Sequence, residues 1–262
     1  MTNLGIESEK RGLMFMNHYK EVEGLPISLI SERTAFRPAM GAVNPNLKIE
    51  DKKTGTTTVG IIGTDFVLLA ADQQATMGNT IADDDAKKIY KITDFIALTI
   101  SGTVGDSLAI IRFLKAQANL YEVERDTKMT PKALTSMLSN VLNGNRYYPY
   151  MFMPVIGGLN NAPELYEVTP FGCISEKKKY AVTGSGTDFA LTTLDSEYRE
   201  AMSEDDALQL AVRAVMAAKN RDIYTGGKTI TVIIIDKAGY REVDVKDVEK
   251  AIAKVKLNVS KK

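Results

Sequence analysis

From residue 57 onward, the first half of the chain alternates β-branched or apolar runs with short polar turns. Residues 57–62 and 66–71 form one such pair, and residues 88–92 and 95–101 form another. Two such runs joined by a short turn are typical of a β-hairpin. Further strands are predicted at residues 153–157, 165–168, 180–182 and 229–236. Several of these runs are apolar on both faces, which indicates sheets that are covered on both sides.

Helical periodicity predicts five helices, at residues 104–122, from residue 130 onward, and at residues 187–202, 207–221 and 245–255. The second begins with Thr130 before Pro131, a capping residue followed by proline in the first turn. Ser203 and the acidic residues after it resemble a capping box. The order is strands, two helices, strands, two helices, strands, and a last helix. This segregation favours an α+β fold in which two sheets pack together and helix pairs cover their outer faces.

Residues 1–55 differ from the rest of the chain. They carry scattered prolines, show no sustained periodicity and end in the polar run Glu50-Asp51-Lys52-Lys53. We interpret them as a leader without a core of its own. The alternative is an ordinary flexible N-terminal extension.

Charge and composition exclude several classes of function. The chain has 33 basic and 33 acidic side chains, so binding of nucleic acid through a basic field is not expected. No apolar run approaches the roughly 20 residues that cross a bilayer, so no membrane partner is expected and a cytoplasmic location is predicted. Cys173 is the only cysteine, which excludes an internal disulfide and a closed zinc set; we interpret it as a small strand or core residue.

The junction between Gly55 and Thr56 is the strongest chemical signal in the sequence. A cut between these two residues would give one residue both a hydroxyl nucleophile and a free α-amine. Such an amine has a pKa of about 7.7–8.0 and is a suitable base for a weakly nucleophilic hydroxyl at neutral pH. The only histidine, His18, precedes the cut, so the remaining chain could not use a Ser-His-Asp or Cys-His mechanism.

Hairpin register suggests partners for Thr56. A first turn centred on Thr64 would place Asp72 opposite Thr56, and a second turn centred near Asp94 would place Lys88 opposite Ile100. A buried lysine near the Thr56 hydroxyl would lower the pKa of that hydroxyl, while Asp72 would keep the lysine charged and oriented.

Gly102 would lie within a diagonal step of Lys88 and could offer its backbone N–H to an oxyanion. Taken singly, Asp72 and Lys88 would be read as solvated turn residues. Gly184-Ser185-Gly186 alone indicates a turn, and Gly226-Gly227 a helix C-terminal cap. The run from Asp83 to Asp85 suggests solvated carboxylates rather than a metal site, and residues 73–87 are interpreted as the lining of a substrate groove.

Six motifs together resemble the catalytic β subunit of the 20S proteasome, archaeal type, an N-terminal nucleophile hydrolase. They are TGTTTVG at 54–60, LLAAD at 68–72, AKKIYKI at 86–92, ISGTVGD at 100–106, TGSG at 183–186 and AAKNRDIYTGG at 217–227. The resemblance implies a four-layer αββα sandwich, with residues 1–55 as a propeptide removed by autocleavage and residues 56–262 as the hydrolase domain.

The resemblance also implies a role for individual residues. Thr56 would be the nucleophile, Asp72 and Lys88 its supporting pair, and Gly102 the oxyanion donor. Ser185, Asp222 and Thr225 would surround the threonine amine; family members often carry serine where Thr225 stands. Substrate-binding residues would be Ala75, Thr76, Ala86, Ile100 and Val104, and their largely apolar character favours cleavage after hydrophobic residues.

The partners that the resemblance implies are proteasome α subunits and other β subunits in a barrel of four seven-membered rings, 28 subunits in all. A regulatory ATPase would act indirectly through the α ring, the substrate would be unfolded polypeptide, and no metal or organic cofactor is expected. Two other functions remain open at this point. One is a structural ring subunit that never matures, and the other is an N-terminal nucleophile amidase for small molecules.

Overall fold

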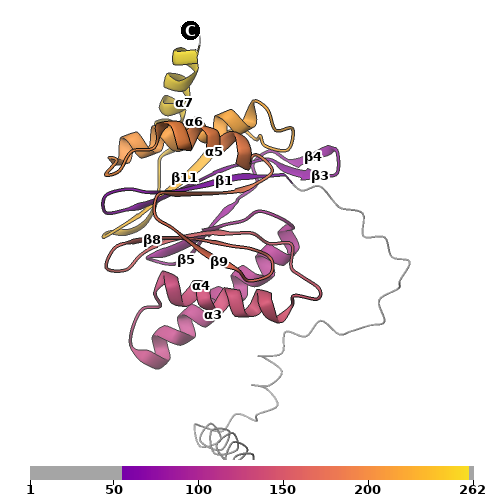
Figure 1. Ribbon diagram of the computed structural model, residues 1–262, viewed down its shortest axis with the longest axis vertical. Coiled ribbons are helices and arrows are strands. Elements are labelled where there is room, and N and C mark those ends of the chain that lie inside the picture. The colour runs from indigo at the N-terminus through magenta and orange to yellow at the C-terminus, as the bar shows by residue number, and fades with distance from the viewer. Residues whose placement is uncertain (1–54, 260–262) are drawn as a thin grey trace, which may run out of the picture. The chain divides into compact units, whose positions relative to one another are not determined.

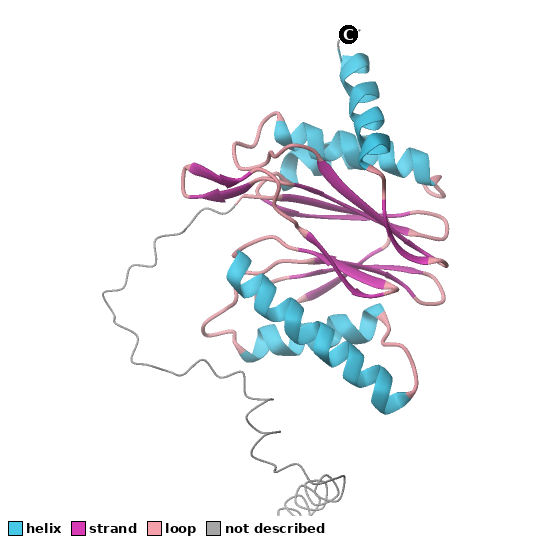
Figure 2. Ribbon diagram, turned by 180° about the vertical axis from the view of Figure 1, so that it is seen from behind, coloured by secondary structure: helices cyan, strands magenta, loops and turns pink. Residues whose placement is uncertain are grey.

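The computed structural model describes residues 55–259, and side chains through residue 257. Apart from Gly55, the predicted leader therefore lies outside the described residues. Two five-stranded antiparallel sheets stack face to face, and helices cover both outer faces (Figure 1). Seen from behind, the same four layers run helix, sheet, sheet, helix (Figure 2). The predicted α+β sandwich is confirmed.

The first sheet has the strand order β10-β1-β2-β11-β12. Its strands are β1 (Thr57–Ile62), β2 (Val67–Asp72), β10 (Tyr180–Gly184), β11 (Ile230–Asp236) and β12 (Gly239–Glu242). Its outer face is covered by α5 (Thr187–Glu197) and α6 (Glu204–Lys219), with α7 (Val245–Val259) beyond them (Figure 1).

The second sheet has the order β5-β6-β7-β8-β9. Its strands are β5 (Ile89–Thr93), β6 (Ile96–Thr99), β7 (Val155–Leu159), β8 (Pro163–Val168) and β9 (Ile174–Lys177). Helices α3 (Val104–Arg125) and α4 (Pro131–Gly144) cover it, and β3 (Ala75–Met77) and β4 (Thr80–Asp83) form a separate hairpin.

Apolar side chains fill three layers of core. One cluster lies between the first sheet and its helices, with Leu68, Leu210 and Val232 among its members. A second lies between the other sheet and α3 and α4 and includes Leu114, Leu138 and Phe152. The third lies between the two sheets. This last layer explains why the strand runs are apolar on both faces.

Capping residues fix the starts of α4 and α6 as the sequence predicts. The Thr130 side chain accepts a hydrogen bond from the N–H of Ala133, and Pro131 occupies the first turn of α4. Ser203 caps α6 by accepting from the N–H of Asp206. The helix predicted at 187–202 ends earlier, at Glu197, and residues 198–203 connect α5 to α6.

Four strands of the described part of the chain were not predicted from the sequence: β3, β4, β9 and β12. They have only three or four residues each, and all four residues of β4 are exposed, so they lack the buried periodic pattern. The interpretation of Cys173 as a strand or core residue is wrong. Cys173 is exposed and lies just before β9.

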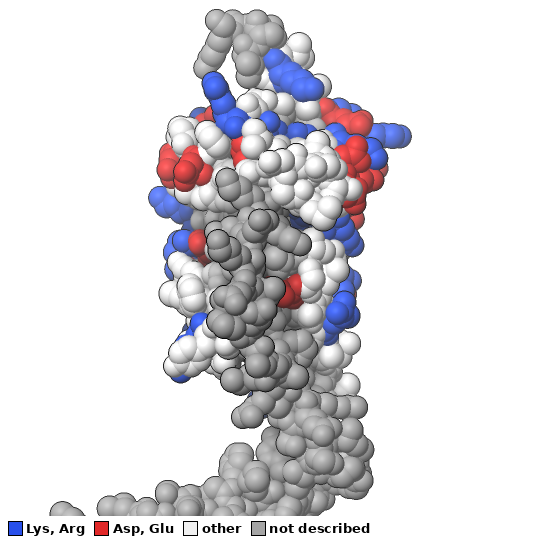
Figure 3. All heavy atoms as spheres, turned by 90° about the vertical axis from the view of Figure 1, so that its right-hand side faces the viewer, with Lys and Arg blue, Asp and Glu red and all other residues white. Residues whose placement is uncertain are grey.

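The charges on one face of the molecule match the balanced composition. On the part of the face in Figure 3 that is not grey, Lys and Arg lie among Asp and Glu without a continuous field of either sign. Among residues 55–259, no helix is both long and apolar enough to cross a membrane.

Candidate active site

Thr56 lies immediately before β1, with only 6% of its surface exposed. Its hydroxyl donates a 2.6 Å hydrogen bond to the carbonyl oxygen of Gly55. Its nitrogen is still a peptide nitrogen, and its N–H donates to the Ser185 hydroxyl at 3.1 Å. The nucleophile predicted from the sequence therefore lies beside the bond that precedes it.

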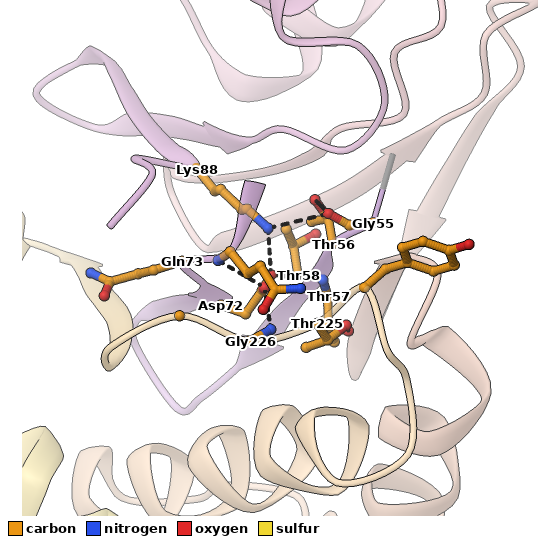
Figure 4. A network of polar contacts seen from close by, with 12 residues as sticks. Gly55, Thr56, Thr57, Thr58, Asp72, Gln73, Lys88, Thr225 and Gly226 are labelled. Carbon is orange, nitrogen blue, oxygen red and sulfur yellow. Dashed lines mark hydrogen bonds and ion pairs between the residues drawn. The ribbon is translucent and has the colours of Figure 1, made fainter. Parts of the chain in front are cut away.

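Asp72 ends β2 with a fully buried carboxylate that accepts four hydrogen bonds. One oxygen accepts from the N–H of Thr57 at 2.9 Å and from the Lys88 ammonium at 2.7 Å. The other accepts from the N–H of Gln74 at 3.2 Å. It also accepts from the N–H of Gly226 at 2.9 Å (Figure 4). With all these donors, the buried charge is solvated by the protein instead of by water.

Lys88 precedes β5 and is 4% exposed. Its ammonium lies between the Asp72 carboxylate, at 2.7 Å, and the Gly55 carbonyl oxygen, at 3.4 Å (Figure 4). Burial lowers the pKa of the Lys88 amine, and the negative charge of Asp72 opposes that change. The ammonium thus connects the buried carboxylate to the carbonyl that Thr56 faces.

The first hairpin is shifted by one residue from its predicted register. Thr58 pairs with Ala71 and Val59 with Ala70, so the position across from Asp72 is Thr57 and not Thr56. The loop contains four residues, 63–66, closed by a hydrogen bond from the N–H of Gly63 to the carbonyl of Phe66. Its centre therefore lies between two residues instead of on Thr64.

The second hairpin has its predicted register through most of its length. Ile89 pairs with Thr99, and the N–H of Ile100 donates to the carbonyl of Lys88 at 2.8 Å. Lys88 therefore lies across from Ile100, as predicted.

Ser185, Asp222 and Thr225 form a second polar group next to Thr56. Both hydroxyls donate to the Asp222 carboxylate. The Thr225 hydroxyl also contacts the hydroxyl of Thr57 at 2.7 Å. Ser185 is exposed and Thr225 is buried, so this group extends from the surface down to β1.

Gly102 lies after β6 with a backbone φ of +112°, a conformation that favours glycine. An added Cβ would meet the carbonyl oxygen of Met151 at 2.0 Å. Gly102 forms an isolated bridge with Phe152. Within residues 55–259, the Gly55 carbonyl accepts from Thr56 and Lys88, and no bond from the Gly102 N–H to it is seen, so the oxyanion role stays a prediction.

The predicted substrate-binding residues differ in exposure. Ile100 is buried, Ala75, Thr76 and Ala86 are partly buried, and Val104 is 51% exposed in the isolated chain. Only the hydroxyl of Thr76 contacts the junction, where it accepts a 3.1 Å hydrogen bond from the N–H of Gly55.

The remaining motifs have structural explanations. Asp83, Asp84 and Asp85 are exposed, and Asp84 pairs with Lys228. In the part of the chain that is described, no group of three or more His, Cys, Asp or Glu side chains could hold a metal ion. Gly226 is not a helix cap, because α6 ends at Lys219 and its C-cap is Asn220; the N–H of Gly226 donates to Asp72 instead.

Comparison with known proteins identifies the family. Residues 52–235 match the family described as proteasome subunit. The chain is 44% identical over 203 residues to the proteasome subunit beta of Methanococcus vannielii, covering 77% of this chain and 92% of that relative. The chain belongs to the proteasome subunit family. It is also 46% identical over 194 residues to proteasome subunit beta 2 of Thermococcus gammatolerans, covering 74% of this chain and 96% of that relative. Proteasome subunit beta 2 of Pyrococcus furiosus is 43% identical over 206 residues, 79% of this chain and 99% of that relative.

The proteasome-family match includes every candidate site residue and the junction itself. Several contacts were nevertheless missed from the sequence, namely the backbone N–H groups of Thr57, Gln74 and Gly226 and the side chain of Thr76. Backbone donors have no residue-type signature, so no sequence signal could have found the first three. For Thr76, the family resemblance indicated a substrate-binding residue, but no sequence pattern indicated its contact with Gly55.

Proposed function

We propose that this proteasome β subunit is a threonine endopeptidase that exposes its own nucleophile by cleaving the Gly55–Thr56 bond. The observation that carries the proposal is the 2.6 Å contact between the Thr56 hydroxyl and the Gly55 carbonyl oxygen. Lys88 approaches the same oxygen from the buried pair with Asp72. A nucleophile, a scissile carbonyl and a cation are therefore preassembled in one buried place.

Self-cleavage begins as an acyl shift from nitrogen to oxygen. The Thr56 hydroxyl oxygen bonds to the Gly55 carbonyl carbon, and the ammonium of Lys88 stabilises the negative charge that develops on the carbonyl oxygen. The bond from this carbon to the Thr56 nitrogen then breaks, and the hydroxyl proton reaches that nitrogen through solvent. Water hydrolyses the resulting ester, which releases Gly55 as a carboxylate and restores the hydroxyl.

The freed Thr56 amine then acts as the base for cleavage of other chains. It accepts the proton of its own hydroxyl as the oxygen attacks a peptide carbonyl, and it returns a proton to the leaving amine. The acyl-enzyme ester is hydrolysed by water. Ser185, with its partners Asp222 and Thr225, already accepts the Thr56 N–H and is suited to hold the amine.

The assembly belongs to the proposal as well. Relatives of 40–46% identity bear the name proteasome subunit beta, which supports a place in the β rings of a 28-subunit barrel with α subunits outside. In the cytoplasm, such a barrel would receive unfolded polypeptide through the α ring from a regulatory ATPase. None of these steps requires a metal or organic cofactor.

The intact mass of the chain after assembly with α subunits tests the proposal. Wild type should lose residues 1–55 and hydrolyse peptides that have a hydrophobic residue before the cleaved bond. Thr56→Ala should keep the leader and show no peptidase activity, whereas Thr56→Ser should retain both reactions because it keeps a hydroxyl. A wild-type chain that still begins at Met1 would instead favour a structural ring subunit.

A further inference from the structure

The residue before the scissile bond is held at both of its polar groups. Its carbonyl oxygen contacts Thr56 and Lys88, and its N–H donates to the Thr76 hydroxyl at 3.1 Å. The first two contacts belong to the chemistry already described. The third comes from a side chain for which that chemistry has no role.

Thr76 lies in the middle of β3, the short strand that pairs with β4. The register of this pair shifts between Ala75 and Thr76. Such irregularities redirect a side chain locally and are common next to active sites. The Thr76 side chain is partly buried, while its neighbour Met77 is exposed, so the hairpin presents the hydroxyl inward to Gly55.

Gly55 needs such a restraint more than another residue would. Glycine has the largest backbone freedom, and fixing one residue costs about 1–2 kcal/mol of conformational entropy. No other residue fits here without rearrangement, because an added Cβ would overlap the Cβ of Tyr224. Position 55 therefore requires a glycine, and the hydrogen bond to Thr76 limits the backbone rotation of that glycine.

We propose that Thr76 is a positioning residue for self-cleavage, an inference that rests on the proposed function. Its hydroxyl accepts the Gly55 N–H and, together with the contacts of Thr56 and Lys88 with the carbonyl oxygen, restricts the two backbone torsions between that N–H and the scissile carbonyl. The carbonyl carbon is then presented to the Thr56 oxygen while the carbonyl oxygen points to Lys88. Thr76 exchanges no proton in this role.

Self-cleavage should depend on this contact more than cleavage of a separate peptide does. In self-cleavage the attacking oxygen and the attacked carbon belong to adjacent residues and must close a five-membered ring, so only a narrow set of orientations is productive. A separate peptide has no such tether and can adjust its position in the site. Loss of the Thr76 hydroxyl should therefore slow self-cleavage more than it slows hydrolysis of a separate peptide.

The test compares leader removal in full-length chains assembled with α subunits, followed by intact mass over time. Thr76→Val keeps the side-chain shape but loses the hydroxyl, and it should slow cleavage about 5- to 10-fold, the effect of one hydrogen bond. Thr76→Ser should cleave within about twofold of wild type. Thr80→Val, an exposed change on the paired strand, is the matched control and should have no effect.

Peptide hydrolysis gives the second readout. Chains that begin directly at Thr56, released from a removable fusion, should show a smaller loss of kcat for Thr76→Val than the loss in leader removal. Wild-type cleavage rates for Thr76→Val, equal losses in both reactions, or a Thr76→Ser rate as slow as Thr76→Val would each overturn the proposal. If Thr76→Val does not assemble, Thr76→Ala carries the same expectations. Leader loss by Thr56→Ala would instead refute the proposed function itself.

Discussion

The Lys88 ammonium lies 2.7 Å from the Asp72 carboxylate, and their side chains are only 5% and 0% exposed. Three backbone N–H groups, from Thr57, Gln74 and Gly226, complete the carboxylate's partners. Among the described residues, the lysine is therefore the only side chain that forms a direct ion pair with this buried anion. Its other contact is the carbonyl oxygen of Gly55, which belongs to the bond that we propose is cleaved. In the proposed function, stability and chemistry therefore depend on the same ammonium group.

Removing this cation should damage folding and cleavage together. Lys88→Met leaves Asp72 buried without its counter-charge, so we expect the free energy of unfolding to fall by about 3–5 kcal/mol and leader removal to stop. Urea denaturation and intact mass measure the two effects. Lys91→Met, on the strand that follows Lys88, is the control: its pair with Asp94 is exposed, so its loss should have little effect on stability. If both variants lowered the free energy of unfolding by similar amounts, burial of the Lys88–Asp72 pair could not explain the effect of Lys88→Met.

The rate of cleavage should fall at alkaline pH as Lys88 loses its proton. Because burial lowers the pKa of this amine, the falling limb should lie below the pH at which an exposed lysine titrates. The stability effect has the opposite sign. Between the folded and unfolded pKa values the unfolded chain binds more protons, so this group makes stability rise with pH in that window.

A pH profile of leader removal, paired with urea denaturation at each pH, separates these effects. Lys88→Arg should shift the alkaline limb upward, since arginine stays protonated in this range, even if its absolute rate is reduced. An unchanged limb in Lys88→Arg would show that another group titrates.

Strong periodic signals were sufficient to predict much of the fold. The apolar runs of β1, β2 and β11 and the capped starts of α4 and α6 are local features, and the structure has them where they were predicted. Strands β4 and β9 were missed because their stability comes from pairing with a neighbour rather than from their own apolar pattern.

The candidate site was predicted less completely. Lys88 lies across from Ile100 as expected, but the first hairpin is one residue out of its predicted register because a four-residue loop has no central residue. Asp72 still reaches the site, since Thr57 binds it and Lys88 extends from it to Gly55. The contact of Thr76 with Gly55 depends on a register shift within a three-residue strand, which no sequence pattern encodes.

Replacing Gly102 should destabilise the chain even before chemistry is considered. Gly102→Ala would place a methyl group 2.0 Å from the Met151 carbonyl oxygen at a φ of +112°. We expect a loss of about 2 kcal/mol or more in the free energy of unfolding, measured with urea. Gly105→Ala, in the first turn of α3 with open space around it, should change stability by less than about 1 kcal/mol. Equal effects would contradict the steric argument.

Hydrogen bonds between buried hydroxyl groups connect the two sheets near the site. Thr99 on β6 donates to the Thr58 hydroxyl on β1 at 3.0 Å and accepts from the N–H of Val155 at 3.0 Å, while Thr58 also contacts Thr183. Thr99→Val would leave a buried N–H without its partner, so we expect a loss of about 1–3 kcal/mol in urea denaturation. Thr99→Ser keeps the hydroxyl and should retain most of that stability. Because Thr58 lies two residues from Thr56, Thr99→Val should also slow leader removal; if stability falls while the cleavage rate is unchanged, these hydrogen bonds support the fold without positioning the nucleophile.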